Sequence, residues 1–299
     1  MMAMAPVTSV AGRSAQPQTK DPMPSAGAAA AMPTMPPSMP MPMAGTPATP
    51  MDKMPDPTMG GGSLPKVAST EMDGPFKAMS AATGGFYVWR PTELGKDGVK
   101  HPVFVWGTGA GAMPDRYNEY FPRFATHGFI VVSPNKAQKE ASDMKAAVDW
   151  IIAQNEDMSS PFHQKVDTAH IGMGGHSQGS LATFDQEAME TRLKTTIHIA
   201  GGSFDMQGSS KVKTPTAYIC GETDIALTNC EADFGAVKDQ PTFFSVLKGV
   251  DHVACARNAM PGMIAWLRWH LGGETERKAE FAAGGKFQMG IWMSQTKNF

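Results

Sequence analysis

Gly175-His176-Ser177-Gln178-Gly179 follows a short apolar run at residues 168–173 and precedes a segment at 180–184 that is compatible with a helix. A Gly-x-Ser-x-Gly motif between a strand and a helix is typical of a nucleophile elbow. In such a turn the serine takes strained backbone angles, and only glycine fits two positions away. With 31 glycines among 299 residues, the motif alone is weak evidence. Its place between a strand and a helix strengthens it, and we expect Ser177 to be a nucleophile.

Outward from this motif, apolar strands alternate with amphipathic helices. This order predicts an α/β fold in which a mainly parallel sheet is covered by helices on both faces. Strands are expected at residues 86–90, 102–106, 129–133, 168–173, 195–200, 216–220 and 242–247, and helices at 117–127, 142–151, 180–184, 258–271 and 274–283. Only about fifteen residues separate the strand ending at Ala200 from the next one, too few for a large helical lid. We therefore expect an open active site.

The N-terminal part of the chain has a different composition. Twelve of the 24 methionines and thirteen of the 24 prolines precede residue 60. Proline at this density removes amide donors and prevents regular elements, so residues 1–70 are interpreted as a disordered Met/Pro/Ala-rich leader and residues 75–299 as one catalytic domain. Methionine-rich tracts can offer thioether ligands to Cu(I), but no histidine or cysteine accompanies these methionines. A spacer is the favoured interpretation.

Charge and hydropathy exclude several classes of function. The formal net charge is −2 and no basic run interrupts the chain, so nucleic-acid binding is not expected. No stretch of about eighteen apolar residues predicts a transmembrane helix. Residues 26–32 are too short and too weakly apolar for a signal sequence, so no signal peptide is visible. We expect a monomer.

The residues that follow two later strands complete a candidate catalytic triad. A serine hydroxyl becomes nucleophilic when a histidine takes its proton and a carboxylate orients and stabilises that histidine. Asp224 comes just after the strand ending at Cys220, and His252 just after the strand ending near Leu247. Catalytic groups of parallel sheets gather beyond the carboxyl ends of the strands. The sequence therefore predicts a triad of Ser177, Asp224 and His252.

Other residues compete for two of these roles. Asp205 and Glu222 are rival acids, with Asp205 the stronger rival, whereas Asp251 would have to fold back on its own backbone to reach His252. His176 is expected to pack or hydrogen-bond beneath the nucleophile and to contribute to the substrate site. The remaining histidines are expected to be structural or at the surface: His101, His127, His163, His170, His198 and His270.

The tetrahedral oxyanion needs preorganised donors, which are usually two backbone amides. The amide of Gln178, directly after the nucleophile, is one candidate. The other should come from the glycine-rich loop after the strand ending at Trp106, with Thr108 favoured and Gly109 second, while Gly107 and Gly109 let the backbone approach the substrate. Neither a Gly-Lys-Ser/Thr end nor a Gly-x-Gly-x-x-Gly motif follows, which argues against phosphate binding by this loop.

Three cysteines are too few for a disulfide scaffold and lack zinc spacing. A Cys230–Cys255 disulfide would tie the Asp224 loop to the His252 loop, with Cys220 a buried thiol. The alternative is three reduced thiols in a cytosolic enzyme. The spacer-like leader favours the disulfide and an extracytoplasmic location, secreted or periplasmic.

At this point the sequence resembles the α/β-hydrolase superfamily, and within it the secreted bacterial and fungal esterases related to cutinase-like polyester hydrolases and platelet-activating-factor acetylhydrolases. The stretches that carry the resemblance are 102–111, 127–132, 174–179, 221–226, 249–252 and 265–269. It implies an α/β-hydrolase fold and a serine carboxylic-ester hydrolase that forms an acyl-enzyme, with nucleophile Ser177, acid Asp224, base His252 and neither cofactor nor metal.

One departure from the resemblance concerns the substrate. Cutinase-type polyester hydrolases often carry aromatic side chains around the oxyanion loop and after the strand that follows the elbow helix, where this chain has Thr108 and Gly201-Gly202. Carboxylesterase activity is therefore favoured over activity on aromatic polyesters, although an open cleft suits bulky or polymeric esters. The alternatives are an acyltransferase with the same triad and a metal-handling protein with a Cu(I)-binding leader.

Overall fold

The computed structural model describes residues 64–138, 140–206 and 208–299. Most of the expected leader therefore lies outside the described residues. Its last residues pack on the domain: the Leu64 side chain is buried, and Arg268 Nη2 donates to the Pro65 carbonyl oxygen at 2.6 Å. The described chain thus includes packed residues N-terminal to the expected start at residue 75.

A single sheet organises the described chain, with the strand order β1-β2-β4-β3-β5-β6-β7-β8-β9. Strands β4, β3, β5, β6, β7 and β8 run parallel to one another, whereas β1 and β2 on one side and β9 on the other pair antiparallel and flank this parallel core. The strands are β1 (Ala78–Thr83), β2 (Phe86–Pro91), β3 (His101–Gly107), β4 (Ile130–Pro134), β5 (Val166–His176), β6 (Leu193–Ile199), β7 (Thr216–Thr223), β8 (Thr242–Asp251) and β9 (Trp292–Lys297).

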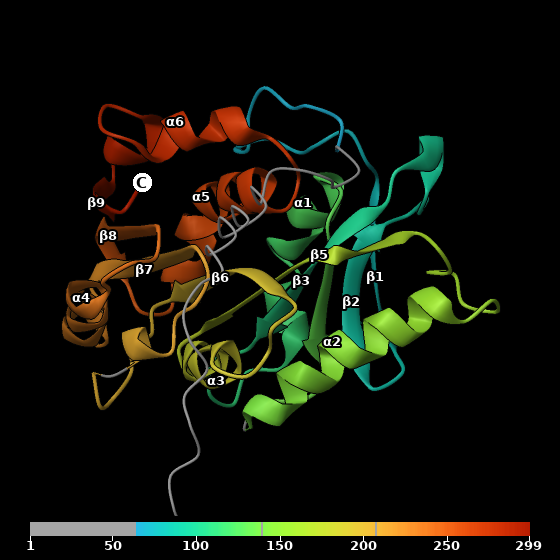
Figure 1. Ribbon diagram of the computed structural model, residues 1–299, viewed down its shortest axis with the longest axis horizontal. Helices are drawn as coiled ribbons and strands as arrows, with labels where there is room; N and C mark the ends of the chain where they lie inside the picture. The colour runs from blue at the N-terminus through green and yellow to red at the C-terminus, as the bar shows by residue number, and fades with distance from the viewer. Residues whose placement is uncertain (1–63, 139, 207) are drawn as a thin grey trace, which may run out of the picture. The chain divides into compact units, whose positions relative to one another are not determined.

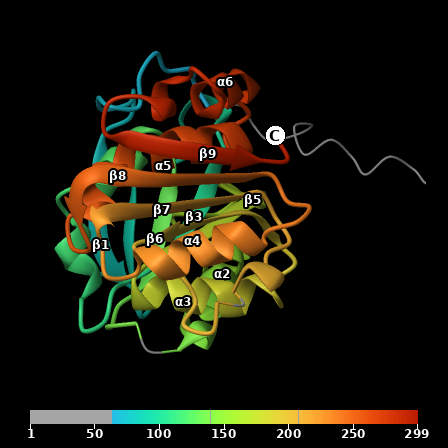
Figure 2. The same cartoon turned by 90° about the vertical axis from the view of Figure 1, so that its left-hand side faces the viewer.

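Helices cover both faces of the sheet (Figure 1). Figure 2 shows α2, α3 and α4 on one side, and α5 and α6 on the other. The helices are α1 (Phe121–Thr126), α2 (Ala141–Glu156), α3 (Gln178–Glu187), α4 (Leu227–Ala236), α5 (Cys255–His270) and α6 (Lys278–Phe281). This arrangement confirms the predicted α/β class, with a mainly parallel sheet between helical layers.

The core lies on both faces because successive strand residues point to opposite sides. In β7, Ile219 belongs to the large cluster that includes α1 and α5, whereas Cys220 belongs to the smaller cluster beneath α4. Every residue of β3 is buried, as expected for a central strand of a parallel sheet. Side chains from α2 complete a third cluster with Val103 and Val105.

The expected Cys230–Cys255 disulfide is wrong. The structure bonds Cys220 to Cys230, and Cys255 remains a buried thiol. The reason lies in the faces of the sheet: Cys220 and Cys230 share the cluster beneath α4, whereas Cys255 belongs to the cluster on the α5 side. There its Sγ donates to the Ile219 carbonyl oxygen at 3.4 Å. The disulfide therefore joins β7 to α4 and does not tie the Asp224 loop to the His252 loop.

The connections at the carboxyl ends of the strands leave the site uncovered. Between β6 and β7 the structure has only a short 3₁₀ turn at Gly208–Ser210, so in the described residues no helical lid follows β6.

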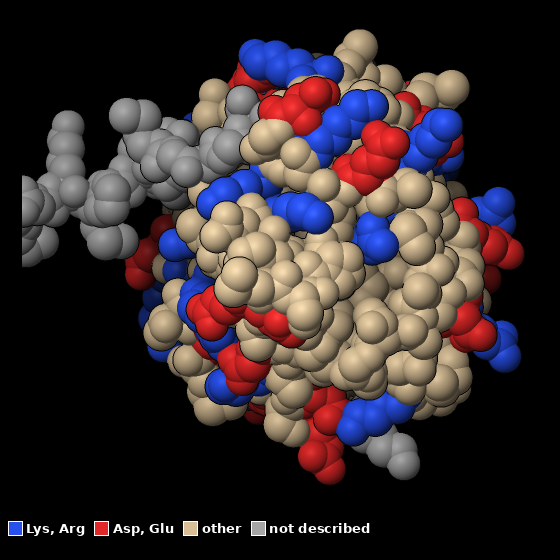
Figure 3. Space-filling view, turned by 90° about the vertical axis from the view of Figure 1, so that its right-hand side faces the viewer, with Lys and Arg blue, Asp and Glu red and all other residues tan. Residues whose placement is uncertain are grey.

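None of the described helices combines the length and apolar character that crossing a bilayer requires. On the face drawn in Figure 3, basic and acidic side chains are interspersed rather than gathered into one charged patch.

Candidate active site

Ser177 occupies the sharp turn between β5 and α3. Its φ of 54° and ψ of −115° lie outside the regions that L-residues favour. A Cβ on Gly175 would lie 2.2 Å from the Gly179 carbonyl carbon, and one on Gly179 would lie 2.1 Å from the Gly107 carbonyl oxygen. Both motif glycines are thus required by close backbone approach. The Ser177 amide donates to the Ile199 carbonyl oxygen at 2.9 Å, which anchors the turn to β6.

The structure brings the three residues of the predicted triad together. His252 Nε2 lies 3.0 Å from Ser177 Oγ, and His252 Nδ1 lies 2.7 Å from Asp224 Oδ1. The Asp224 side chain is fully buried, and its Oδ1 also accepts the Ala226 amide at 2.8 Å. Because a carboxylate can only accept, Nδ1 carries the proton and Nε2 is free to accept the serine proton. This is the arrangement that nucleophilic catalysis by serine needs.

The rival carboxylates have other positions. Glu222 Oε2 accepts the Gly249 amide at 2.8 Å, and Asp251 Oδ1 accepts the Ala254 amide at 2.8 Å, just before α5. Asp205 is exposed. Among the four candidate acids, Asp224 is the one that the structure places against the His252 imidazole.

His176 connects the oxyanion loop to the backbone of the proposed base. Its Nε2 donates to the His252 carbonyl oxygen at 2.9 Å, so Nδ1 is the acceptor and faces the Tyr117 hydroxyl at 3.3 Å. That hydroxyl in turn accepts the Gly109 amide at 2.9 Å. Burial lowers the pKa of His176, and the nearby His252 imidazole adds to this effect against the opposing hydrogen bond to the His252 carbonyl. The neutral ring thus fixes the loop that carries His252.

The same contacts distinguish the two oxyanion candidates in the loop after β3. The amide hydrogen of Gly109 is already donated to the Tyr117 hydroxyl. Thr108 is buried, and its hydroxyl accepts the Gln138 amide at 3.1 Å, which holds the loop in place. Gln178 begins α3, where backbone amides without helical partners face outward. Thr108 and Gln178 thus stay the predicted pair of donors.

Comparison with known proteins places the chain in a family. Residues 46–298 match the family model described as PET hydrolase-like. The chain belongs to this family. It is also similar to Cutinase 2 of Thermobifida cellulosilytica, with 27% identity over 179 residues that make up 54% of this chain and 65% of that cutinase. Cutinase cut1 of Thermobifida fusca is likewise 27% identical over 179 residues, which make up 54% of each chain.

These similarities have a limited extent. The aligned part of the chain spans 54% to 65% of the length of the two cutinases, which is less than two thirds. The family match, together with the observed sheet, shows that the fold is that of an α/β-hydrolase of the cutinase-like group.

In this PET hydrolase-like chain, two clefts meet at Ser177 and His252. We call the first the apolar cleft; it has a volume of about 320 Å³, and its lining also includes Ala110, Gln178, Leu181, Ala200, Gly201, Gly202, Phe204, Ile225, Ala226 and Asn229. We call the second the polar cleft; it measures about 700 Å³, and its lining also includes Gly109, Ala110, Gly111, Ala112, Arg116, Tyr117, Glu119, Tyr120, His176, Asp251, Val253, Ala254 and Arg257. An ester bound at Ser177 can extend into both.

Sequence reasoning missed several residues of these clefts. Ala110 lines both, one position beyond the expected oxyanion residues. Phe204 and Ile225 line the apolar cleft and are 85% and 86% exposed, and Val253 at the polar cleft is 80% exposed. Each follows the end of a strand or stands next to a predicted triad residue, and a large apolar side chain in such a loop is a signal for substrate contact.

Proposed function

We propose that the protein is a serine carboxylic-ester hydrolase that works through an acyl-enzyme. The observation that carries this proposal is the His252 imidazole, which contacts Asp224 at 2.7 Å and Ser177 at 3.0 Å at the junction of two open clefts. The family match and the cutinase relatives support the same activity.

The geometry supports a two-step reaction. Ser177 Oγ attacks the ester carbonyl carbon while His252 Nε2 takes the hydroxyl proton, and Asp224 stabilises the imidazolium. The amides of Gln178 and Thr108 stabilise the oxyanion. The bond to the leaving oxygen then breaks as His252 gives its proton to the departing alcohol. Water, deprotonated by the same imidazole, attacks the acyl-enzyme and releases the carboxylic acid together with free Ser177.

The proposed substrates are esters of the polyester type. Positions 201 and 202 are glycines and provide no aromatic side chain. Phe204 and Ile225, which line the same cleft, provide exposed apolar surface instead. An extended apolar chain can lie across this surface without entering a closed tunnel, and the open clefts give water the access that hydrolysis requires. The methionine-rich residues of the Cu(I) alternative lie outside the described residues.

We further propose an extracytoplasmic location. The Cys220–Cys230 disulfide supports it, because such bonds persist in oxidising compartments. The two similar proteins are named cutinases, which is consistent with a protein that meets its substrate outside the cell.

The proposed function is tested by comparing the parent with Ser177→Ala on a series of p-nitrophenyl esters and on a polyester film. Removal of the nucleophile leaves only the oxyanion donors and binding, so kcat/KM should fall by at least about a thousandfold. Ser245→Ala is the matched control, because Ser245 is a buried serine of β8 outside both clefts and its variant should keep its activity. Near-parental turnover by Ser177→Ala, or a parent without ester hydrolysis, would end the assignment.

A further inference from the structure

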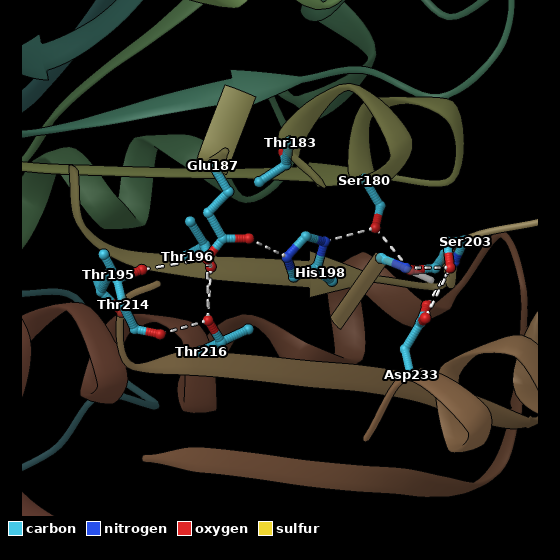
Figure 4. Close-up of polar contacts among 12 residues, drawn as sticks. Ser180, Thr183, Glu187, Thr195, Thr196, His198, Ser203, Thr214, Thr216 and Asp233 are labelled. Atoms are coloured by element: carbon cyan, nitrogen blue, oxygen red, sulfur yellow. Dashed lines mark hydrogen bonds and ion pairs between the residues drawn. The ribbon is translucent and has the colours of Figure 1, made fainter. Parts of the chain in front are cut away.

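A second series of serine, histidine and carboxylate side chains, which we call the buried series, links α3 to β6: Ser180, His198 and Glu187 (Figure 4). Ser180 Oγ is 2.9 Å from His198 Nδ1, and His198 Nε2 is 3.4 Å from Glu187 Oε2. All three are buried, and the side chains of His198 and Glu187 are fully inaccessible. None of the three lines either cleft.

The donor and the acceptor of each hydrogen bond at Ser180 can be assigned. The Ser180 hydroxyl donates to the Gly201 carbonyl oxygen at 2.6 Å, and a carbonyl can only accept. Because that uses the only hydroxyl proton, His198 Nδ1 must donate to Ser180 Oγ. Ser180 is therefore not a second nucleophile. Its hydroxyl relays a hydrogen bond from the buried histidine to the backbone of Gly201.

At the other end of the buried series, Glu187 and His198 are held by hydroxyl groups and aromatic rings. Glu187 Oε1 accepts the Thr196 hydroxyl at 2.5 Å, and the hydroxyl groups of Thr214 and Thr216 each lie 3.2 Å from the same oxygen, as Figure 4 shows in part. The His198 ring is stacked on Phe184 and Tyr218, with ring centroids 3.8 and 5.1 Å away. A buried carboxylate is costly unless it is fully hydrogen-bonded, and a fully bonded network permits a single arrangement of its members.

At the Ser180 end, the buried series contacts a wall of the apolar cleft. Gly201 lines this cleft, and a Cβ on it would lie 2.9 Å from the Ser177 carbonyl oxygen. The preceding residue, Ala200, has a φ of 49°, a conformation that residues with a Cβ rarely adopt. Strained backbone of this kind persists only where the surroundings hold it. Two such contacts are present: the Ala200 amide donates to the Ile219 carbonyl oxygen at 2.9 Å, and Ser180 holds Gly201.

The same wall is anchored on its other side by α4. Asp233 Oδ2 accepts the Ser203 amide at 2.6 Å and its Oδ1 accepts the Ser203 hydroxyl at 2.7 Å, while Asn229 Nδ2 donates to the Ser203 carbonyl oxygen at 2.7 Å. The buried side chains of Ser180 and Asp233 thus hold the backbone on both sides of Gly202, which has no side chain of its own to fix it.

We propose that Glu187, His198 and Ser180 are positioning residues that fix the Ala200–Gly202 wall of the apolar cleft and so determine which ester chains the enzyme prefers. The inference rests on the proposed esterase function, because the wall acts on the substrate bound at Ser177. It predicts a change in selectivity, whereas mere destabilisation lowers the amount of folded enzyme and affects all substrates alike.

The decisive measurement is the ratio of kcat/KM for p-nitrophenyl hexanoate to that for p-nitrophenyl acetate. We expect the hexanoyl chain to contact more of the wall than the acetyl group does, so Ser180→Ala should change the ratio by at least about fivefold. An inactive fraction cancels in this ratio. Ser245→Ala is again the matched control: the buried Ser245 Oγ lies 2.9 Å from Ser294 Oγ and outside both clefts, and the ratio of this variant should stay at the parental value.

Variants of His198 give an independent measurement. His198→Leu removes the donor to Ser180 Oγ and should shift the ratio as Ser180→Ala does. His198→Asn places an amide donor near the position of Nδ1 and should restore the ratio to within about twofold of the parent. A parental ratio in active Ser180→Ala enzyme would overturn the proposal, whether or not His198→Leu folds.

Failure of the proposed function can be told apart from failure of this inference. A parent that hydrolyses neither ester contradicts the esterase assignment and leaves the ratio undefined. The wall is then judged from crystal structures of the parent and Ser180→Ala. A turned Gly201 carbonyl and a negative φ at Ala200 in the variant would support the inference, and an unchanged wall would overturn it.

Discussion

Asp224 is the residue whose role a single substitution tests most sharply. In Asp224→Asn the buried side chain keeps its shape but loses the charge that stabilises the imidazolium, and its amide favours the wrong tautomer of His252. We expect kcat to fall by roughly a thousandfold or more, with little change in KM, in steady-state hydrolysis of p-nitrophenyl butyrate.

The rival acids provide the matched controls for this substitution. Asp205→Asn removes an exposed charge, and Glu222→Gln alters a contact to the Gly249 amide on the loop before His252. Both should keep kcat within about threefold of the parent. A loss in Asp205→Asn as large as that in Asp224→Asn would mean that the acid has been wrongly assigned.

At the scale of single residues, the sequence predicts well those groups whose position follows from the sheet. Ser177, Asp224 and His252 each follow a strand, and parallel strands end at the same edge, so their proximity in the structure needs no knowledge of packing. His198 is different. It lies inside β6 and was expected to be structural or at the surface, and its partners depend on how α3 packs on the sheet. A histidine within an apolar strand signals that buried partners must exist, but not which ones.

At the scale of elements, continuous apolar runs predict the central strands, whereas the edges of the sheet escape notice. β1 has five exposed residues of six, and β9 alternates between half-buried and exposed positions, so neither forms an apolar run. The expected helix at 274–283 is reduced to a 3₁₀ turn at Thr275–Arg277 and the short α6. Helix α4 was not foreseen, and it is this helix that turns Cys230 toward β7. The disulfide was predicted wrongly because this helix was not predicted.

The Cys220–Cys230 disulfide should stabilise the junction of β7 and α4. It closes a loop with a sequence separation of 10, for which the entropy of the unfolded chain gives about 2–3 kcal/mol. The double variant Cys220→Ala/Cys230→Ala should lose about this free energy of unfolding in urea titrations. Helix α4 carries Asn229 and Asp233, which hold the wall of the apolar cleft. The double variant should therefore also lose its activity at a lower temperature than the parent does.

Treatment with a reductant distinguishes the stability that comes from the disulfide bond from the stability that comes from packing of the two sulfur atoms. Dithiothreitol should lower the stability of the parent toward that of the double variant, and the double variant should not respond. Cys255→Ala should still respond, because Cys255 takes no part in the disulfide. A double variant as stable as the oxidised parent would contradict the stabilising role.

At the scale of the whole molecule, buried histidines should make the fold sensitive to mild acid. Burial, aided by the charges of Arg268 and Arg277, lowers the pKa of His127 to about 4, and burial lowers that of His270 to about 3. Both values lie below the ordinary value of 6.5, so between pH 6.5 and about 4 the unfolded chain binds protons that the folded chain does not. The contribution of these two histidines to stability should therefore be constant above pH 6.5 and fall by up to about 1.4 kcal/mol per pH unit for each histidine below it.

His127 allows this linkage to be measured. Its Nε2 donates to the Met72 carbonyl oxygen at 2.9 Å, whereas its buried Nδ1 has no hydrogen-bond partner among the described residues. His127→Gln can keep the donor and cannot titrate, so the slope of unfolding free energy against pH should become shallower by about 1 kcal/mol per pH unit. Glu274 and Asp149, whose pKa values are lowered, lose their contribution only below their own ordinary values of 4.5 and 3.8, outside most of this window. A slope equal to that of the parent in urea titrations near pH 5 and pH 6 would show that His127 is not the titrating group.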